Sequence, residues 1–182
     1  SLEKSAATYA DAFLTVSEIT ANECRYLLGR EVTRITPNGF ENDFVPEAKE
    51  LETLRKDSRK RIIEVASATW GYNFQNDTLI VGTSGRYEFR NKGIDVFLES
   101  LKQLAASNLE RDIIAVVAVP AASTGARADL VAHLENKESS IDPSQRRYLT
   151  HYLENEAWDQ VCQSVDGSIL STTASHVKVL FV

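Results

Sequence analysis

The stretch GRYEFRNKG, residues 85–93, decides how the chain is organised. A short apolar run at residues 78–82 precedes it. After it, apolar residues recur at steps of three and four, as in an amphipathic helix: Ile94, Phe97, Leu98, Leu101, Leu104 and Ala105. The stretch is therefore predicted to connect a buried strand to a helix. In open α/β sheets, ligands bind at the carboxyl ends of the strands, where such connections lie.

This connection carries three cations, Arg86, Arg90 and Lys92, beside the start of the expected helix. Backbone N–H groups at a helix N-terminus lack partners, and the helix dipole favours an anion there. Asn91 is predicted to cap the helix, and Gly93 lets a ligand approach the backbone closely. The pattern indicates phosphate or diphosphate binding, although solvated surface charges are an alternative that the same residues allow.

Strand and helix patterns alternate along the chain, which predicts a parallel sheet with helices on both faces. The strands of this sheet are expected at residues 78–82, 113–119 and 177–182. Residues 113–119 form a continuous β-branched run, as in a central strand covered on both faces. The other expected elements are strands at residues 13–16 and 34–36, a turn at 37–39, a loop at 121–125, and helices at 2–12, 17–28, 46–69, 127–135 and 142–162.

Three of these helices have distinctive signals. Ser17 is predicted to cap the second helix and Gly29 to end it. The helix at residues 46–69 is highly charged with a thin apolar stripe, which indicates a solvated helix packed by one edge. The sequence DPSQ at residues 142–145 offers a capping acid, a first-turn proline and a glutamine, so a helix should start there. That helix should bury some of Tyr148, Leu149, Tyr152, Leu153 and Trp158.

The motif GRYEFxNKGxD, which ends at Asp95, resembles the signature that opens the C-terminal domain of animal and fungal glycogen synthases, glycosyltransferase family three. Three more segments resemble that family in the same order: TVSEIT at residues 15–20, TPNG at 36–39 and Pro120-Ala121. The resemblance extends over about residues 3–130. It implies a Rossmann-like α/β fold that is part of a two-domain GT-B glycosyltransferase.

The resemblance also implies a domain organisation. Residues 1–38 would be the last elements of the N-terminal domain, and residues 39–70 the interdomain crossover and a long charged helix. Residues 71–182 would be the first half of the C-terminal nucleotide-sugar-binding domain. The chain would then be a fragment, which is one explanation for its lack of methionine; omission of modified methionines from the written sequence is the other.

Family members are retaining enzymes that transfer glucose from a nucleotide diphosphate sugar to the 4-hydroxyl of a growing α-1,4-glucan. By resemblance the donor is UDP-glucose rather than ADP-glucose, the acceptor is glycogen or another α-glucan, and no metal or cofactor takes part. Arg86 and Lys92 would bind the donor diphosphate, where negative charge develops as the sugar leaves. Glu88 would orient Arg86, and Arg90 would be solvated. The supporting residues of this donor loop would be Gly85, Glu88, Asn91 and Gly93.

The resemblance places no catalytic residue within these residues. The family's paired glutamates, its sugar-facing histidine and its base-binding residues all correspond to positions outside the chain, so the chain alone is expected to be inactive. One position departs from the family pattern, because Ala122 stands where animal and fungal members have a basic residue. A donor contact from that loop is therefore in doubt.

Two other functions remain open. One is another retaining glycosyltransferase of the sucrose or trehalose phosphate synthase type, and the other is a non-catalytic nucleotide-binding or interaction module. A net charge of −6 without a long basic run argues against nucleic-acid binding, and the longest apolar run, residues 113–119, is too short to span a membrane. Cys24 and Cys162, far apart in sequence, suggest reduced thiols in a cytoplasmic protein.

The remaining candidate residues give no signal for other chemistry. The three histidines, His133, His151 and His176, lack the spacing of metal ligands. The candidate serines Ser17, Ser123 and Ser168 do not lie in the Gly-x-Ser-x-Gly turn that carries a hydrolase nucleophile.

Overall fold

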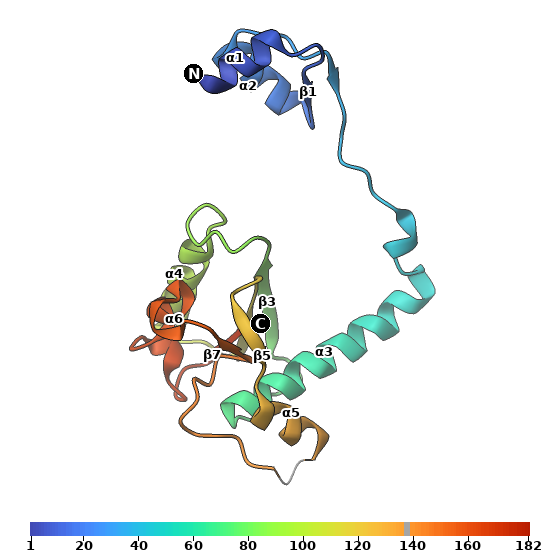
Figure 1. Cartoon of the computed structure of the whole chain (residues 1–182). Helices are drawn as coiled ribbons and strands as arrows, with labels where there is room; N and C mark the ends of the chain where they lie inside the picture. Colours follow the sequence, from blue (N-terminus) through green and yellow to red (C-terminus); the bar gives the residue numbers. More distant parts are fainter. Residues whose placement is uncertain (137–138) are drawn as a thin grey trace. The chain divides into compact units, whose positions relative to one another are not determined.

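The computed structural model describes residues 1–136 and 139–182, which form two compact units, Ser1–Ala48 and Lys49–Val182 (Figure 1). The first unit contains α1 (Leu2–Tyr9), β1 (Leu14–Thr15), α2 (Glu18–Leu28), β2 (Arg34–Ile35) and the 3₁₀ turn η1 (Asn42–Phe44). Strands β1 and β2 pair in parallel.

The predicted limits of α2 are confirmed. The hydroxyl of Ser17 accepts a hydrogen bond from the Thr20 amide at 3.1 Å, which satisfies one of the free donors at the helix start. Gly29 ends the helix at a φ of 71°, a conformation that suits glycine because it has no Cβ.

The turn predicted at residues 37–39 is wrong, because these residues have no regular structure and Gly39 is not in the left-handed region. Proline, asparagine and glycine permit the backbone conformations of a turn, but a turn forms only where the neighbouring segments also pack against each other. Here the segment continues toward η1 and α3 instead.

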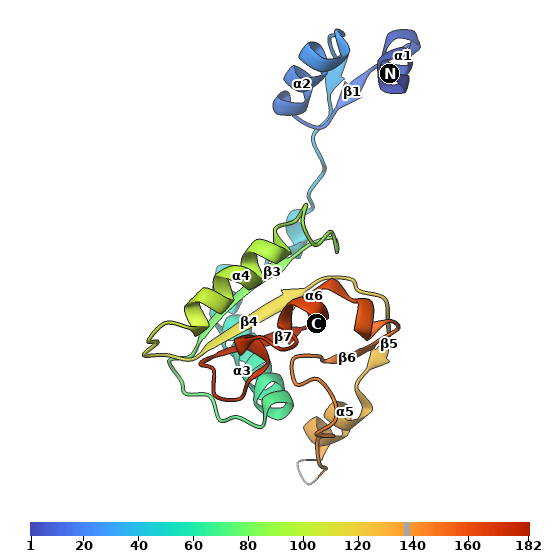
Figure 2. The same cartoon turned by 90° about the vertical axis from the view of Figure 1, so that its left-hand side faces the viewer.

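The second unit is an α/β layer structure. Its elements are α3 (Ala48–Trp70), β3 (Leu79–Ser84), α4 (Ile94–Ala105), β4 (Ile113–Ala118), β5 (Ser123–Ala126), α5 (Ala128–Glu135), β6 (His151–Leu153), η2 (Glu156–Trp158), α6 (Gln160–Val165), η3 (Ile169–Ser171) and β7 (Val177–Phe181). The main sheet has the order β3-β4-β7 with both pairs parallel, as predicted (Figure 2). Helices α4 and α6 cover one face and α3 and α5 the other, so the predicted α/β class is confirmed (Figure 1).

The core lies on both sides of the central strand β4. Helix α4 buries Ile94, Leu98 and Leu101 on one side. On the other side, Trp70 at the end of α3 is 1% exposed, and its indole N–H donates to the Val179 carbonyl of β7 at 2.9 Å. This bond ties the last turn of α3 to the sheet.

Strand β3 is less buried than its apolar sequence predicts. Leu79 and Val81 are 44% and 38% exposed. The reason is topological, since β3 is at the edge of the sheet and pairs with β4 alone among the described residues. An apolar run indicates a strand, whereas its burial depends on what packs beside it.

The long helix α3 follows its prediction in part. It is packed at one end rather than along one edge, because only its last turns are buried, at Ala66, Ala68, Thr69 and Trp70. The apolar side chains of Leu51 and Leu54 are 44% and 46% exposed.

The helix predicted at residues 142–162 is wrong. Asp142 does accept hydrogen bonds from Ser144, but no helix starts there, and α6 begins only at Gln160. Phe181 of β7 accepts from the Thr150 amide at 3.2 Å and donates to the Tyr148 carbonyl at 2.7 Å. The guanidinium of buried Arg127 donates to two further carbonyls, those of Arg146 and Leu149. These long-range hydrogen bonds use backbone groups of the segment that a helix would need, so tertiary contacts override the local helix propensity.

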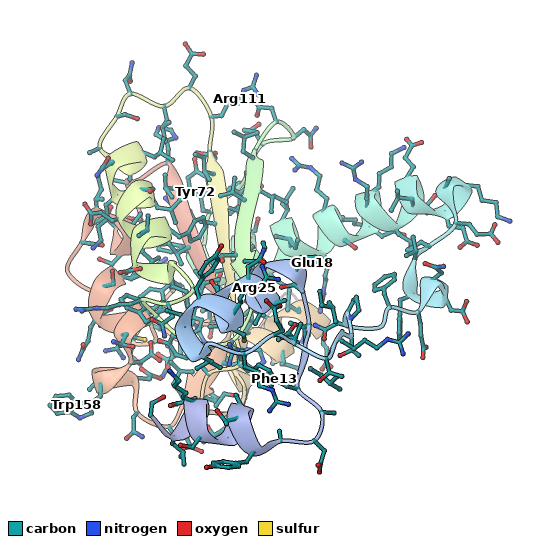
Figure 3. The ribbon with its side chains drawn as sticks, turned by 90° about the horizontal axis from the view of Figure 1, so that it is seen from above. Phe13, Glu18, Arg25, Tyr72, Arg111 and Trp158 are labelled. Atoms are coloured by element: carbon teal, nitrogen blue, oxygen red, sulfur yellow. The ribbon has the colours of Figure 1, made fainter. Side chains whose placement is uncertain are left out.

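The same segment supplies β6, which pairs antiparallel with β5. Strand β5 itself takes the place of most of the loop predicted at residues 121–125. Tyr148 and Leu149 are buried as predicted. Trp158, in contrast, is 79% exposed and projects from the surface (Figure 3).

Candidate functional site

Two glycines bound the connection between β3 and α4. Gly85 follows β3 with a φ of 146°, and Gly93 precedes α4 with a φ of 68°. A Cβ at either position would meet nothing within 4 Å, so the requirement for glycine is one of backbone conformation rather than crowding. The glycines predicted to support the donor loop therefore set where it begins and ends.

Glu88 is the centre of the polar contacts within this loop. Its Oε1 lies 2.9 Å from Nη1 of Arg86, and its Oε2 accepts from the side-chain Nδ2 of Asn91 at 3.5 Å. The Arg86 side chain remains 75% exposed, whereas that of Glu88 is 32% exposed. Exposed ion pairs add little stability, so the pair mainly restricts the orientation of a guanidinium that stays open to a ligand. The predicted pairing of Glu88 with Arg86 is present.

The other two cations of the loop, Arg90 and Lys92, are exposed, and their side chains bond to no residue that the structure describes. The structure therefore does not separate Lys92, predicted to bind the donor, from Arg90, predicted to be solvated.

The start of α4 differs from its prediction. The amides of Ile94 and Asp95 donate to the Phe89 carbonyl at 2.9 and 3.2 Å, because the loop folds back over the helix end. Asn91 is not the cap; Gly93 occupies that position without a capping side chain. These helix amides are already bonded, so an anion would have to be held by the loop side chains and by loop amides.

Several loop amides are open, including two successive ones at the start of the loop. The backbone N–H groups of Arg86 and Tyr87 donate to no residue within the described parts of the chain. Successive amides of this kind can form an anion-binding concavity. One of these amides belongs to Arg86 itself, and the other belongs to the next residue.

The aromatic residues of the loop face the interior. The ring of Tyr87 meets that of Phe181 edge to face, with centroids 5.9 Å apart, and its hydroxyl donates to Asp159 Oδ1 at 2.8 Å. Sequence reasoning missed Asp159 because it placed this residue within the wrongly predicted helix. A correct helix start at Gln160 would have pointed to it, since Asp is a preferred cap.

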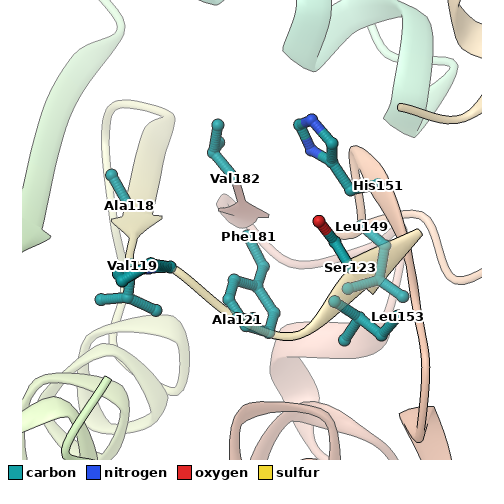
Figure 4. A pocket seen from close by; sticks show the side chains of 10 residues that line it. Ala118, Val119, Ala121, Ser123, Leu149, His151, Leu153, Phe181 and Val182 are labelled. Atoms are coloured by element: carbon teal, nitrogen blue, oxygen red, sulfur yellow. The ribbon is translucent and has the colours of Figure 1, made fainter. Parts of the chain in front are cut away.

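A hollow of about 360 Å³ lies at the carboxyl ends of β4 and β7 (Figure 4). Ala118 and Val119 line it on one side, and Ser123 and His151 from the β5–β6 pair line it on the other. Its remaining lining is largely apolar. None of the six residues predicted for the donor loop borders it.

The histidines are engaged in other contacts. His176 Nδ1 lies 2.8 Å from Asp112 Oδ1, and His151 Nδ1 lies 2.8 Å from the Thr150 hydroxyl. Within residues 1–136 and 139–182, no three His, Cys, Asp or Glu side chains gather as metal ligands do. No helix in the same residues is both long and apolar enough to cross a membrane.

A parallel sheet of order β3-β4-β7, with a cation-bearing loop at the end of β3, defines a Rossmann-like α/β protein. The chain belongs to the glycogen synthase family, whose family model matches residues 1–136. That match includes the whole β3–α4 connection.

Comparison with individual relatives supports the same family. The chain is 32% identical to the glycogen [starch] synthase of Neurospora crassa over 155 residues, which cover 80% of the chain. It is 32% identical to isoform 1 of the Saccharomyces cerevisiae enzyme over 79% of the chain, and 37% identical to the human liver enzyme over 57%. The chain spans about a fifth of the length of the two fungal relatives, 22% in each case.

Proposed function

We propose that the protein carrying this chain transfers glucose from a nucleotide diphosphate sugar to the 4-hydroxyl of an α-1,4-glucan, with retention of configuration. Membership of the glycogen synthase family supports the reaction. The observation that carries the site is the Arg86–Glu88 pair, which leaves a restrained and exposed guanidinium beside two open amides.

The glucosyl transfer reaction requires a fixed cation at the leaving diphosphate. As the bond from the sugar to the diphosphate breaks, negative charge grows on the leaving oxygen, and a fixed cation stabilises that charge most in the transition state. Arg86 supplies a planar fork of donors for two phosphate oxygens. Lys92, exposed and without a bonded partner in the described structure, supplies a second positive charge at the same loop.

UDP-glucose is the proposed donor. The loop sequence, GRYEFRNKG, resembles the animal and fungal type, and several of the relatives found are glycogen [starch] synthases from fungi and man. We further propose the two-domain GT-B architecture, with residues 1–38 belonging to one domain and residues 71–182 to the other. Glycogen is the proposed acceptor.

The test is glucosyl transfer by the natural full-length protein. It would be assayed with glycogen and either UDP-glucose or ADP-glucose, each over a range of concentrations. Transfer with a higher kcat/KM for UDP-glucose is the expected result. Tight UDP binding without transfer to any glucan would contradict the proposal and favour a non-catalytic nucleotide-binding module.

A further inference from the structure

The donor loop is attached to a distant part of the chain through one side chain. The hydroxyl of Tyr87 donates to Asp159 Oδ1 at 2.8 Å and accepts from the Val161 amide at 3.1 Å. Asp159 and Val161 lie at the start of α6, more than seventy residues further along the chain. Tyr87 is flanked in sequence by Arg86 and Glu88, the two residues of the exposed ion pair.

The partner of this hydroxyl is itself held in place. Asp159 caps α6, since its Oδ1 also accepts from the amides of Val161 and Cys162 at 2.9 and 3.0 Å. Both of those residues are fully buried in the core. Burial raises the pKa of Tyr87 well above its ordinary value, so the hydroxyl stays a neutral donor at any physiological pH.

The ring of Tyr87 is fixed as well, because it packs edge to face on Phe181 of the buried strand β7. Phe89, two residues on, also packs against the core. The loop thus alternates between side chains that face inward and the outward-facing Arg86, Glu88 and Arg90, of which Glu88 is partly buried. Anchoring the inward residues sets the direction of the outward ones.

We propose that Tyr87 and Asp159 are positioning residues that hold the β3–α4 loop so that Arg86, oriented by Glu88, faces the donor diphosphate. This inference rests on the proposed function for its consequence in catalysis. The contacts themselves do not depend on it.

The chain offers a matched control at the opposite end of the same helix. The hydroxyl of Tyr148 donates to Asp166 Oδ1 at 2.6 Å, and Asp166 follows the last residue of α6. Tyr148 is buried, and none of its hydrogen bonds within the described residues involves the β3–α4 loop. Tyr148→Phe therefore removes a similar hydrogen bond without detaching the loop.

The experiment compares Tyr87→Phe, Tyr148→Phe and the unmodified full-length protein by hydrogen exchange and steady-state kinetics. The amides to follow are those of Lys92, Gly93 and Ile94, which are bonded within the loop. In Tyr87→Phe they should exchange faster and kcat should fall by about ten- to a hundredfold, because small misplacements of a positioning group are costly. In Tyr148→Phe both quantities should stay close to those of the unmodified protein.

Variants of Asp159 separate positioning from simple stability. Asp159→Asn keeps an acceptor oxygen for Tyr87 and should retain most of the turnover. Asp159→Ala should lose as much turnover as Tyr87→Phe, with little change in the KM for UDP-glucose.

The outcomes distinguish the two proposals. Unchanged exchange in Tyr87→Phe, or faster exchange with normal turnover, would overturn the positioning role. Equal losses of turnover in Tyr87→Phe and Tyr148→Phe would also overturn it, because the effect would then be general. If the unmodified protein transfers no glucose, the proposed function fails, and the exchange data still decide whether Tyr87 holds the loop.

Discussion

Nη1 of Arg86 lies 2.9 Å from Oε1 of Glu88, two residues further along the same loop. We predict that Glu88→Ala in the full-length protein lowers kcat by about tenfold, because Arg86 loses its restraint but keeps its charge. Glu88→Gln should lose less, since its amide oxygen still accepts from Arg86. Steady-state kinetics with UDP-glucose varied provide the measurement. A loss as large as that of Arg86→Ala would show that Glu88 has a direct role instead.

The two tryptophans of the chain should differ sharply in their effect on stability. Trp70 is 1% exposed and bonds to the sheet, so Trp70→Ala should lower the free energy of unfolding by about 3–5 kcal/mol. Trp158 is 79% exposed, so Trp158→Ala should change it by less than about 0.5 kcal/mol. Denaturant unfolding of the 182-residue chain measures both. Similar values for the two variants would contradict the core described here.

Stability should depend on pH through the pair Arg127–Asp129. Burial raises the pKa of Asp129, but the hydrogen bonds from Arg127 and from the Asp142 and Leu130 amides outweigh it and leave the pKa below its ordinary value. A carboxyl with a lowered folded pKa stabilises the fold above its unfolded pKa and loses that contribution as the pH falls through the folded value. The direction of the effect is therefore toward greater stability at neutral pH.

The variant Asp129→Asn isolates this contribution. It leaves the buried Arg127 without its counter-charge and should lower the free energy of unfolding by about 3 kcal/mol at pH 7. The difference from the unmodified chain should shrink below about pH 4. Asp57→Asn on the exposed half of α3 is the control and should change little at either pH. A difference that grows on acidification would contradict the assignment.

Local signals predicted much of the fold. The cap at Ser17, the stop at Gly29 and the β-branched run of β4 act within a few residues, and each element lies where it was expected. The helix expected at residues 142–162 failed because partners from β7 and Arg127 take the backbone groups that the helix would need. The sequence did not predict the exposure of β3 for a related reason. This strand is at the edge of the sheet, and the order of strands in a sheet depends on the rest of the chain rather than on the residues of the strand.

At the candidate site too, the sequence predicted local contacts but not long-range ones. The motif locates the loop and pairs Glu88 with Arg86, because both residues are close in sequence. It gave the wrong cap, Asn91, since the preference for asparagine does not reveal that the Phe89 carbonyl already occupies the helix amides. It also gave no sign of Asp159, whose contact with Tyr87 exists only in the folded chain.

The 182-residue chain by itself is predicted to transfer no glucose. It spans 22% of the Neurospora crassa relative, and the resemblance places the paired glutamates and the sugar-facing histidine elsewhere. The measurement is incorporation of glucose from UDP-glucose into glycogen. Turnover above a control without protein would contradict this prediction.

The central claim is that Arg86 stabilises the charge that develops on the leaving diphosphate. The most direct test is the kcat of Arg86→Ala in the full-length protein, with UDP-glucose varied at saturating glycogen. The expected result is a kcat lower by about a hundred- to a thousandfold, which corresponds to about 3–4 kcal/mol, with a small change in KM. Arg86→Lys should recover part of the loss, and Arg90→Ala, which removes an exposed arginine of the same loop, should stay near normal. A near-normal kcat in Arg86→Ala, or an equal loss in Arg90→Ala, would contradict the account.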